Sequence, residues 1–169
     1  TTSTLQQEAY NLLGMSAKQT MTLAQKLYET GRITYMRTDS LNLSEQFMTA
    51  TQEFVKKQWG EKYVNGGVAY KTSKKGAQEA HEAIRPTDVA AEPESLRAEL
   101  DPGMFRLYDL IWRRTVASQL PSAKIERTAI DFAANAHTFR GNGSIVTFDG
   151  FMKVWQASED KLLPNVSEG

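Results

Sequence analysis

Residues 16–40 read SAKQTMTLAQKLYETGRITYMRTDS, and this stretch sets the pattern for the chain. Its first four residues, Ser16–Gln19, have capping-box form, and apolar residues then recur every three or four positions as far as Gly31. This spacing predicts a helix over 16–30. The β-branched residues that follow favour extended backbone. Tyr35 is therefore expected on an extended connector that leaves the end of a helix.

Three further helices are predicted from the same kind of spacing. A short first helix should end at Gly14, and a third should begin at Ser44 and end near Trp59. A long helix should open at the pair Asp101-Pro102 and continue through Val116. Each of these ends carries a residue that commonly begins or terminates a helix.

The remainder of the chain predicts one more helical piece and a β segment. Two helical turns are expected over 78–85, because Pro86 disfavours helix beyond Arg85. After Pro121 the apolar residues alternate, which predicts β structure with a hairpin around Gly141–Gly143. The expected fold class is α+β, mainly helical, with a small antiparallel β segment.

Composition limits the classes of protein to consider. Hydrophobic residues make up 40% and charged residues 24% of the 169, as in ordinary globular proteins. The lack of cysteine excludes disulfides and thiolate metal sites, and two histidines argue against a His-rich metal site. No membrane span or signal peptide is evident, so a cytoplasmic location is expected. The 20 basic residues equal the 20 acidic ones, so the broad positive charge of an independent DNA-binding domain is missing.

Tyr35 and Arg37 form the first candidate pair for chemistry. A tyrosine hydroxyl has a pKa of about 10, so a catalytic tyrosine needs neighbours that stabilise its phenolate and hold a phosphate in line. On an extended connector the two side chains would point to the same side, which suits a hydroxyl attacking a phosphodiester held by the guanidinium. The alternative is an ordinary half-buried aromatic beside a solvated arginine, and the spacing alone favours that alternative.

A second candidate group surrounds His81. On a helix, His81 and Arg85 would lie one turn apart and face the same way, with Glu82 beside them, so that both cations could meet one phosphate. Such a histidine could donate to a phosphoryl oxygen or shuttle a proton. The alternative, favoured by spacing alone, is a capped surface helix in which Glu82 pairs with a lysine or arginine.

Gln25 and Glu29 form a third pair, four residues apart on the helix that leads to Tyr35. They could simply form a polar helix face. Glu29 could instead orient a hydroxyl near Tyr35 or pair with Arg32, and the spacing does not decide between these roles.

Three motifs in a fixed order carry a family resemblance. GRITYMRTDS at 31–40 is similar to the active-site tyrosine segment of type IA DNA topoisomerases. The methionine after the tyrosine, Met36, resembles the residue at this place in the bacterial topoisomerase I branch of the family. The segments 16–29 upstream and 78–86 downstream resemble the same family in the same order. The resemblance covers essentially the whole chain.

The resemblance implies a DNA strand-passage reaction. In such enzymes the tyrosine attacks one DNA strand, becomes linked to the 5′ phosphate, and religation after strand passage relaxes negative supercoils without nucleotide hydrolysis. By this resemblance Tyr35 is the nucleophile, Arg37 positions the scissile phosphate, and His81 assists phosphate binding or proton transfer. Polar positions implied to bind substrate are Gln25, Glu29, Thr34, Thr38, Asp39, Glu82 and Arg85.

The resemblance also implies that part of the active site lies outside this chain. In family members an acidic Toprim domain, which binds Mg²⁺ and supplies a phosphate-contacting lysine, precedes this region, and nothing in residues 1–169 resembles it. Stabilising the leaving alkoxide without those groups would be difficult. The chain is therefore expected to be a fragment that binds no metal itself and neither cleaves nor relaxes DNA alone.

The same resemblance implies a division into domains. Residues 1–123 would form the helical domain with the tyrosine, 124–157 the returning half of a β-rich arch domain, and 158–169 a tail towards a missing domain. Two strands alone do not make a stable sheet. An unpaired edge carrying Ile145, Val146 and Phe148 could then pair with a second copy in a non-native dimer.

Two other interpretations remain beside the enzymatic one. The chain could be a non-catalytic helical DNA-binding module whose arginine-bearing helix enters a groove, although its neutral charge disfavours this. It could also be a protein-interaction piece whose motifs are structural. If the enzymatic interpretation holds, weak binding to single-stranded DNA is expected through Arg37, His81, Arg85 and the basic run 71–75, with the protein associated with the nucleoid.

Overall fold

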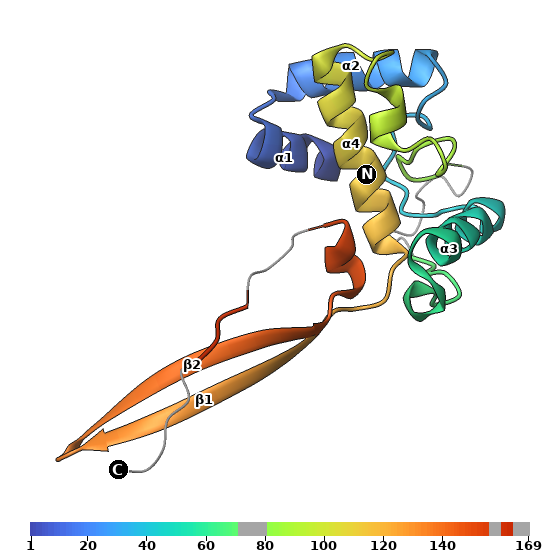
Figure 1. Ribbon diagram of the computed structural model, residues 1–169. Helices are drawn as coiled ribbons and strands as arrows, with labels where there is room; N and C mark the ends of the chain where they lie inside the picture. The colour runs from blue at the N-terminus through green and yellow to red at the C-terminus, as the bar shows by residue number, and fades with distance from the viewer. Residues whose placement is uncertain (71–80, 156–159, 164–169) are drawn as a thin grey trace.

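The computed structural model describes residues 1–70, 81–155 and 160–163, and in this part of the chain four α-helices pack together while a long hairpin projects away from them (Figure 1). The helices are α1 (Thr2–Leu13), α2 (Ala17–Glu29), α3 (Glu45–Trp59) and α4 (Pro102–Ser118). Short 3-10 helices cover Glu61–Tyr63, Pro93–Leu96 and Gly150–Lys153. The strands are β1 (Lys124–Ala134) and β2 (His137–Phe148). The predicted α+β class, mainly helical, is confirmed.

The predicted helix ends are confirmed by capping geometry. The Ser16 hydroxyl accepts a hydrogen bond from the Gln19 amide at 3.2 Å, which satisfies one of the free donors at the start of α2. Gly14 ends α1 in the left-handed conformation, with φ 68°. α4 begins where predicted, with Asp101 at the N-cap position and Pro102 as the first helical residue, although the Asp101 side chain makes no capping hydrogen bond.

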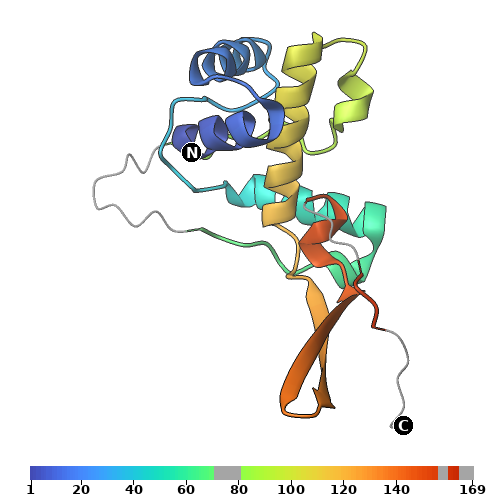
Figure 2. The same cartoon turned by 90° about the vertical axis from the view of Figure 1, so that its left-hand side faces the viewer.

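The core forms around α4, which crosses α1 and α2 and packs against both (Figure 2). Leu107, Tyr108 and Val116 of α4 are fully buried, as is Leu27 of α2. Two buried polar groups of α4 are hydrogen-bonded: the Tyr108 hydroxyl donates to the Ala91 carbonyl at 2.7 Å, and the Trp112 ring nitrogen donates to the Val89 carbonyl at 2.8 Å. This core fixes the two ends of the connector that carries Tyr35.

The hairpin turn is not where the sequence predicts it. The strands are antiparallel and the turn consists of Asn135 and Ala136, with Asn135 at φ 53°. Gly141–Gly143 lie inside β2, so the predicted turn there is wrong. Gly143 has a packing role instead, because a Cβ at this position would lie 2.8 Å from Cγ of Leu163.

The edge of β2 differs from the expectation as well. Ser144 and Lys161 pair through two backbone hydrogen bonds of 2.9 Å, and the Val146 amide donates to the Asp160 carboxylate at 2.8 Å. The prediction that this edge is unpaired around Val146 is therefore wrong. Within the described residues it is the outer edge of β1 that has no strand partner.

The root of the hairpin packs closely against the helices. Gly150 has φ 49°, and a Cβ there would lie 2.4 Å from the Pro121 carbonyl oxygen, so only glycine fits this approach. Beside it, the Tyr63 hydroxyl donates to the Asp149 carboxylate at 2.5 Å. These contacts fix the base of the hairpin.

Some sequence predictions fall on residues that the structure does not describe. They are the basic run 71–75, residues 78–80 of the predicted helical turns, and most of the tail 158–169. In the described part of the chain, no helix combines the length and the apolar character needed to cross a membrane.

Candidate functional site

The connector after α2 places alternate side chains in the core and in solvent. It is irregular rather than a regular strand, with one isolated bridge between Ile33 and Pro86. Met36 is buried, whereas Tyr35 on one side of it and Arg37 on the other are exposed. The two candidate side chains therefore lie on the solvent side of the connector, as the sequence predicts for extended backbone.

The segment around His81 is not helical, which corrects the sequence prediction. From His81 to Arg85 it is non-helical, and the Thr34 amide donates to the Arg85 carbonyl at 2.9 Å. The Ala83 amide donates to the Asn42 carbonyl at 2.8 Å. These backbone bonds to the connector replace those that a helix would make, and Pro86 already disfavours helix at Arg85. His81 and Arg85 are thus not one helical turn apart.

Three rings from separate segments lie close together at the surface. The Tyr35 ring centroid lies 5.2 Å from that of Tyr28 in α2, in an edge-to-face arrangement. The Tyr35 ring also neighbours that of His81, with 6.4 Å between ring centroids and 33° between ring planes. Tyr35 is 39% exposed and Tyr28 41% exposed, so both tyrosine rings are open to solvent. The structure thus brings Tyr35 and His81 together, although they are far apart in sequence.

An open pocket of about 510 Å³ connects His81 with the residues that follow Tyr35. Arg37 and Asp39 line it from the connector, and the first turns of α1 contribute the rest of the wall. The full lining is Thr2, Ser3, Gln6, Arg37, Thr38, Asp39 and His81. A guanidinium and an imidazole facing one open polar pocket can hold a phosphate group between them.

Sequence reasoning missed the role of Thr2. Its hydroxyl donates to the Met36 carbonyl at 2.7 Å and accepts from the Thr38 amide at 2.9 Å, and its own amide donates to the Thr38 carbonyl at 2.8 Å. The first residue of α1 therefore holds the connector on either side of Arg37. No local pattern signals a bond between segments so far apart in sequence.

Thr34 and Thr38 use their hydroxyls within the scaffold. Thr34 donates to the Ala83 carbonyl at 2.7 Å and accepts from the Arg85 amide at 3.0 Å. The Thr38 hydroxyl accepts from the Ser40 amide at 3.0 Å. Their hydroxyls stabilise the two segments that carry Tyr35 and His81.

Arg85 and Glu82 also point into the scaffold rather than into the open pocket. The Arg85 guanidinium pairs with the Glu82 carboxylate at 2.5 Å and lies 4.2 Å from the ring centroid of Phe47 in α3. The other oxygen of Glu82 accepts from the Ser44 amide at 2.9 Å. The side chain of Arg85 is only 12% exposed. This geometry favours a structural connection to the start of α3.

The third candidate pair forms a local bond on α2. The Gln25 amide donates to the Glu29 carboxylate at 2.7 Å. Arg32 pairs with Glu99 at 2.5 Å instead of with Glu29. Glu29 is exposed and lies next to Tyr28 on the helix that leads to Tyr35.

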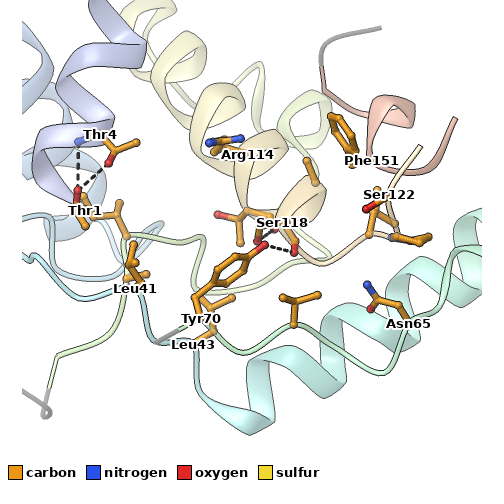
Figure 3. A pocket seen from close by; sticks show the side chains of 17 residues that line it. Thr1, Thr4, Leu41, Leu43, Asn65, Tyr70, Arg114, Ser118, Ser122 and Phe151 are labelled. Atoms are coloured by element: carbon orange, nitrogen blue, oxygen red, sulfur yellow. Dashed lines mark hydrogen bonds between the residues drawn. The ribbon is translucent and has the colours of Figure 1, made fainter. Parts of the chain in front are cut away.

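A second pocket, of about 520 Å³, lies where the hairpin joins the helices (Figure 3). Figure 3 shows Tyr70 reaching across it, and its hydroxyl donates to the Ser118 carbonyl at 2.9 Å. Arg114 and Phe151 line it from other sides. None of the candidate residues around Tyr35 lines this pocket.

The described part of the chain offers no metal centre, since it holds no group of three or more His, Cys, Asp or Glu side chains close enough to bind an ion. The cationic and hydroxyl groups around Tyr35 suit an anionic substrate instead.

Comparisons with known proteins identify the family of the chain. A model of the DNA topoisomerase family matches residues 1–169. The chain is 46% identical over 172 residues to DNA topoisomerase 1 of Pseudomonas aeruginosa, covering 99% of this chain and 20% of that protein. It is 44% identical over 186 residues to DNA topoisomerase 1 of Mycolicibacterium smegmatis, covering 99% of this chain and 20% of that protein.

A solved structure gives the same result. The full-length topoisomerase I from Thermotoga maritima aligns with a TM-score of 0.84 and 36% identity, covering 99% of this chain and 28% of that one. The chain spans about a fifth of the length of the curated relatives it matches. The family match over the whole chain and the agreement in fold show that this chain belongs to the bacterial type IA DNA topoisomerases.

Proposed function

We propose that this chain supplies the nucleophile of an enzyme that transiently cleaves one DNA strand, passes a strand through the break and religates it, so relaxing negative supercoils. The observation that supports this most directly is the position of Tyr35, exposed beside His81. Arg37 and His81 face one open pocket. The DNA would be held as a single strand, in the bacterial cytoplasm.

The cleavage step is a transesterification at phosphorus. The Tyr35 hydroxyl oxygen forms a bond to the phosphorus while the bond from phosphorus to the 3′ oxygen breaks, which leaves a 5′-phosphotyrosine. The hydroxyl proton passes to a base, and the departing 3′ oxygen takes up a proton. Religation reverses both changes, so the bond energy is kept and no nucleotide is hydrolysed.

We assign the supporting roles by geometry. Arg37 holds the phosphate oxygens through its guanidinium, and His81 hydrogen-bonds the phosphate or carries the proton. Asp39 lines the same pocket and orients polar groups there. Gln25 and Glu29 act from α2, where they hydrogen-bond to each other.

Four of the residues implied to bind substrate have scaffold contacts that favour a supporting role. Thr34 and Thr38 hold the connector, while Glu82 and Arg85 connect the His81 segment to the start of α3. We propose that they act on DNA through the positions of Tyr35, Arg37 and His81.

The negative charge that develops on the leaving 3′ oxygen needs stabilising groups beyond those around Tyr35. We propose that Mg²⁺, held by a Toprim domain in the longer family members, supplies that stabilisation together with a lysine. The isolated chain would then bind single-stranded DNA weakly and would not cleave it.

We also propose that the helical part and the hairpin belong to different domains of a longer protein, with 1–123 in the first, 124–157 in an arch domain and 158–169 leading onwards. On one face of the hairpin Phe132 lies opposite Phe139, and on the other Asp131 pairs with Arg140. Phe132 is 43% and Phe139 61% exposed. The outer edge of β1, which has no strand partner among the described residues, would pair with a second copy in a non-native dimer. Light scattering over a range of concentrations tests this, and a constant monomer mass would contradict it.

The experiment that tests the proposed function rejoins this chain to a Toprim-containing region from the same family. With Mg²⁺ and single-stranded DNA, the joined protein should form a covalent adduct that resists denaturation. Tyr35→Phe should abolish the adduct, and Tyr10→Phe, at an exposed tyrosine of α1, should leave it intact. DNA binding with no adduct in any variant would instead favour a non-catalytic DNA-binding module.

A further inference from the structure

Tyr28 is an exposed aromatic residue beside the nucleophile that the proposed function leaves without a role. It lies on the last turn of α2, where its neighbour Leu27 is fully buried while Tyr28 itself is 41% exposed. Its ring meets the Tyr35 ring edge-to-face, with 67° between the ring planes. One part of the ring is thus packed against Tyr35 and another part is open to solvent.

Exposed aromatic rings beside a cationic pocket are typical of single-strand recognition, because every nucleobase has a flat face that can stack on them. Here Arg37 and His81 line the pocket, and the Tyr35 ring lies beside that of His81. Tyr28 lies against Tyr35 from α2, the helix before the connector. A phosphate held at Tyr35 and Arg37 carries a nucleoside on each side, and the Tyr28 ring, 5.2 Å from the Tyr35 ring, is near enough for one of the two bases to reach it.

We propose that Tyr28 stacks on the nucleobase next to the phosphate that Tyr35 attacks. This inference rests on the proposed function and deepens it, since it names the part of the substrate that α2 contacts. Stacking is tolerant of base identity. Tyr28 therefore fixes the register of the strand, while Arg37 contributes charge.

Phosphate contacts and stacking contacts respond differently to salt, so a salt series distinguishes the role of Arg37 from that of Tyr28. Loss of a phosphate contact lowers the salt dependence of single-strand binding, by a slope of about 0.7 for each contact. Loss of a stacking contact weakens binding, on the order of tenfold, without changing that slope. Tyr28→Leu should therefore weaken binding at constant slope, and Arg37→Ala should weaken binding and reduce the slope.

The binding test uses the full 169-residue chain and a fluorescently labelled oligothymidylate, titrated across a salt series. Tyr28→Phe keeps the ring and should bind as the wild type does. Tyr10→Leu removes a tyrosine that is 68% exposed on α1 and should have no effect. Equal affinity of Tyr28→Leu and wild type would overturn the stacking role. If Arg37→Ala still weakened binding in that case, the proposed function would stand.

A second measurement needs no variant and so does not depend on how a variant folds. An oligonucleotide with 5-iodouracil at successive positions is irradiated with the wild-type chain, and the crosslinked peptides are identified by mass spectrometry. Crosslinks to Tyr28 from one or two neighbouring positions are the expected result. Crosslinks that leave Tyr28 unmodified at every position would overturn the proposal and would assign Tyr28 only to holding the Tyr35 ring. No DNA binding at all would contradict both this proposal and the proposed function.

Discussion

The ring of His81 lies 6.4 Å from the ring of Tyr35, and neither residue belongs to a regular helix or strand. The two side chains meet because two irregular segments pair through the bridge between Ile33 and Pro86. The hydroxyl of Thr34, on the Tyr35 segment next to this bridge, makes two hydrogen bonds to the His81 segment, to the Ala83 carbonyl and from the Arg85 amide. The candidate site therefore depends on a few hydrogen bonds between connectors.

Thr34→Val should weaken that pairing. The substitution keeps the shape of the side chain but leaves the Ala83 carbonyl and the Arg85 amide without their partner, at a cost of about 1–3 kcal/mol in the free energy of unfolding. Urea denaturation measures this. The control is Thr22→Val, which removes a hydroxyl bond on the exposed side of α2 and should change the free energy by less than about 0.5 kcal/mol. Equal losses in the two variants would contradict the prediction.

Substitution of Arg85 should mainly affect stability, whereas substitution of Arg37 should mainly affect DNA binding. Arg85→Met leaves the Glu82 carboxylate without its partner in a partly buried place and should lower the free energy of unfolding by about 3 kcal/mol. Arg37→Ala changes an exposed side chain and should alter the free energy of unfolding by less than about 0.5 kcal/mol. Only Arg37→Ala should reduce the salt dependence of single-strand binding. A reduced slope for Arg85→Met would mean that Arg85 contacts phosphate directly.

Tyr63 should make the stability of the fold depend on alkaline pH. Its hydrogen bond to the Asp149 carboxylate, together with burial and the negative charge, raises its pKa to about 12. Because the pKa is higher in the folded state, the stabilisation is complete below about pH 10, the unfolded value, and is lost as the pH rises through about 12.

Urea denaturation at several pH values between about 8 and about 11 tests this, with Tyr63→Phe as the comparison. The wild type should lose stability faster than the variant over the upper part of this range. Tyr108, whose burial also raises its pKa to about 12, is present in both proteins and cancels in the comparison. Parallel curves for the two proteins would show that the Tyr63 hydroxyl has no such effect.

Gly150→Ala should destabilise the base of the hairpin more than Gly66→Ala does. Both glycines have positive φ, at 49° and 80°, so the backbone cost of alanine is similar. At Gly150 the new methyl would meet the Pro121 carbonyl at 2.4 Å, whereas at Gly66 it would meet nothing within 4 Å. We expect a difference of about 2 kcal/mol or more in the free energy of unfolding. Equal effects would show that the hairpin base shifts to admit the methyl group.

The sequence predicts the helices well because their signals are local. The capping residue Ser16, the terminating glycine Gly14 and the pair Asp101-Pro102 each act within one helical turn, and all three lie where predicted. The hairpin turn was harder to predict, because Gly143 is glycine for its contact with Leu163, which no local pattern indicates.

The candidate site also has features that the sequence predicts and features that it does not. The exposure of Tyr35 and Arg37 follows from the alternation of the connector, and this much the residues themselves predict. The non-helical course of the His81 segment, the bonds of Thr2 and the position of Tyr28 all depend on contacts between distant segments. The helical periodicity around His81 was misleading because backbone bonds to Thr34 and Asn42 outweigh it.

The sharpest test of Tyr35 as the nucleophile is to identify the residue that becomes linked to DNA. The chain joined to a Toprim-containing region is trapped with single-stranded DNA and Mg²⁺, digested with nuclease and protease, and analysed by mass spectrometry. We expect a nucleotide attached through its 5′ phosphate to Tyr35. A nucleotide on another residue, or an adduct that persists in Tyr35→Phe, would contradict it.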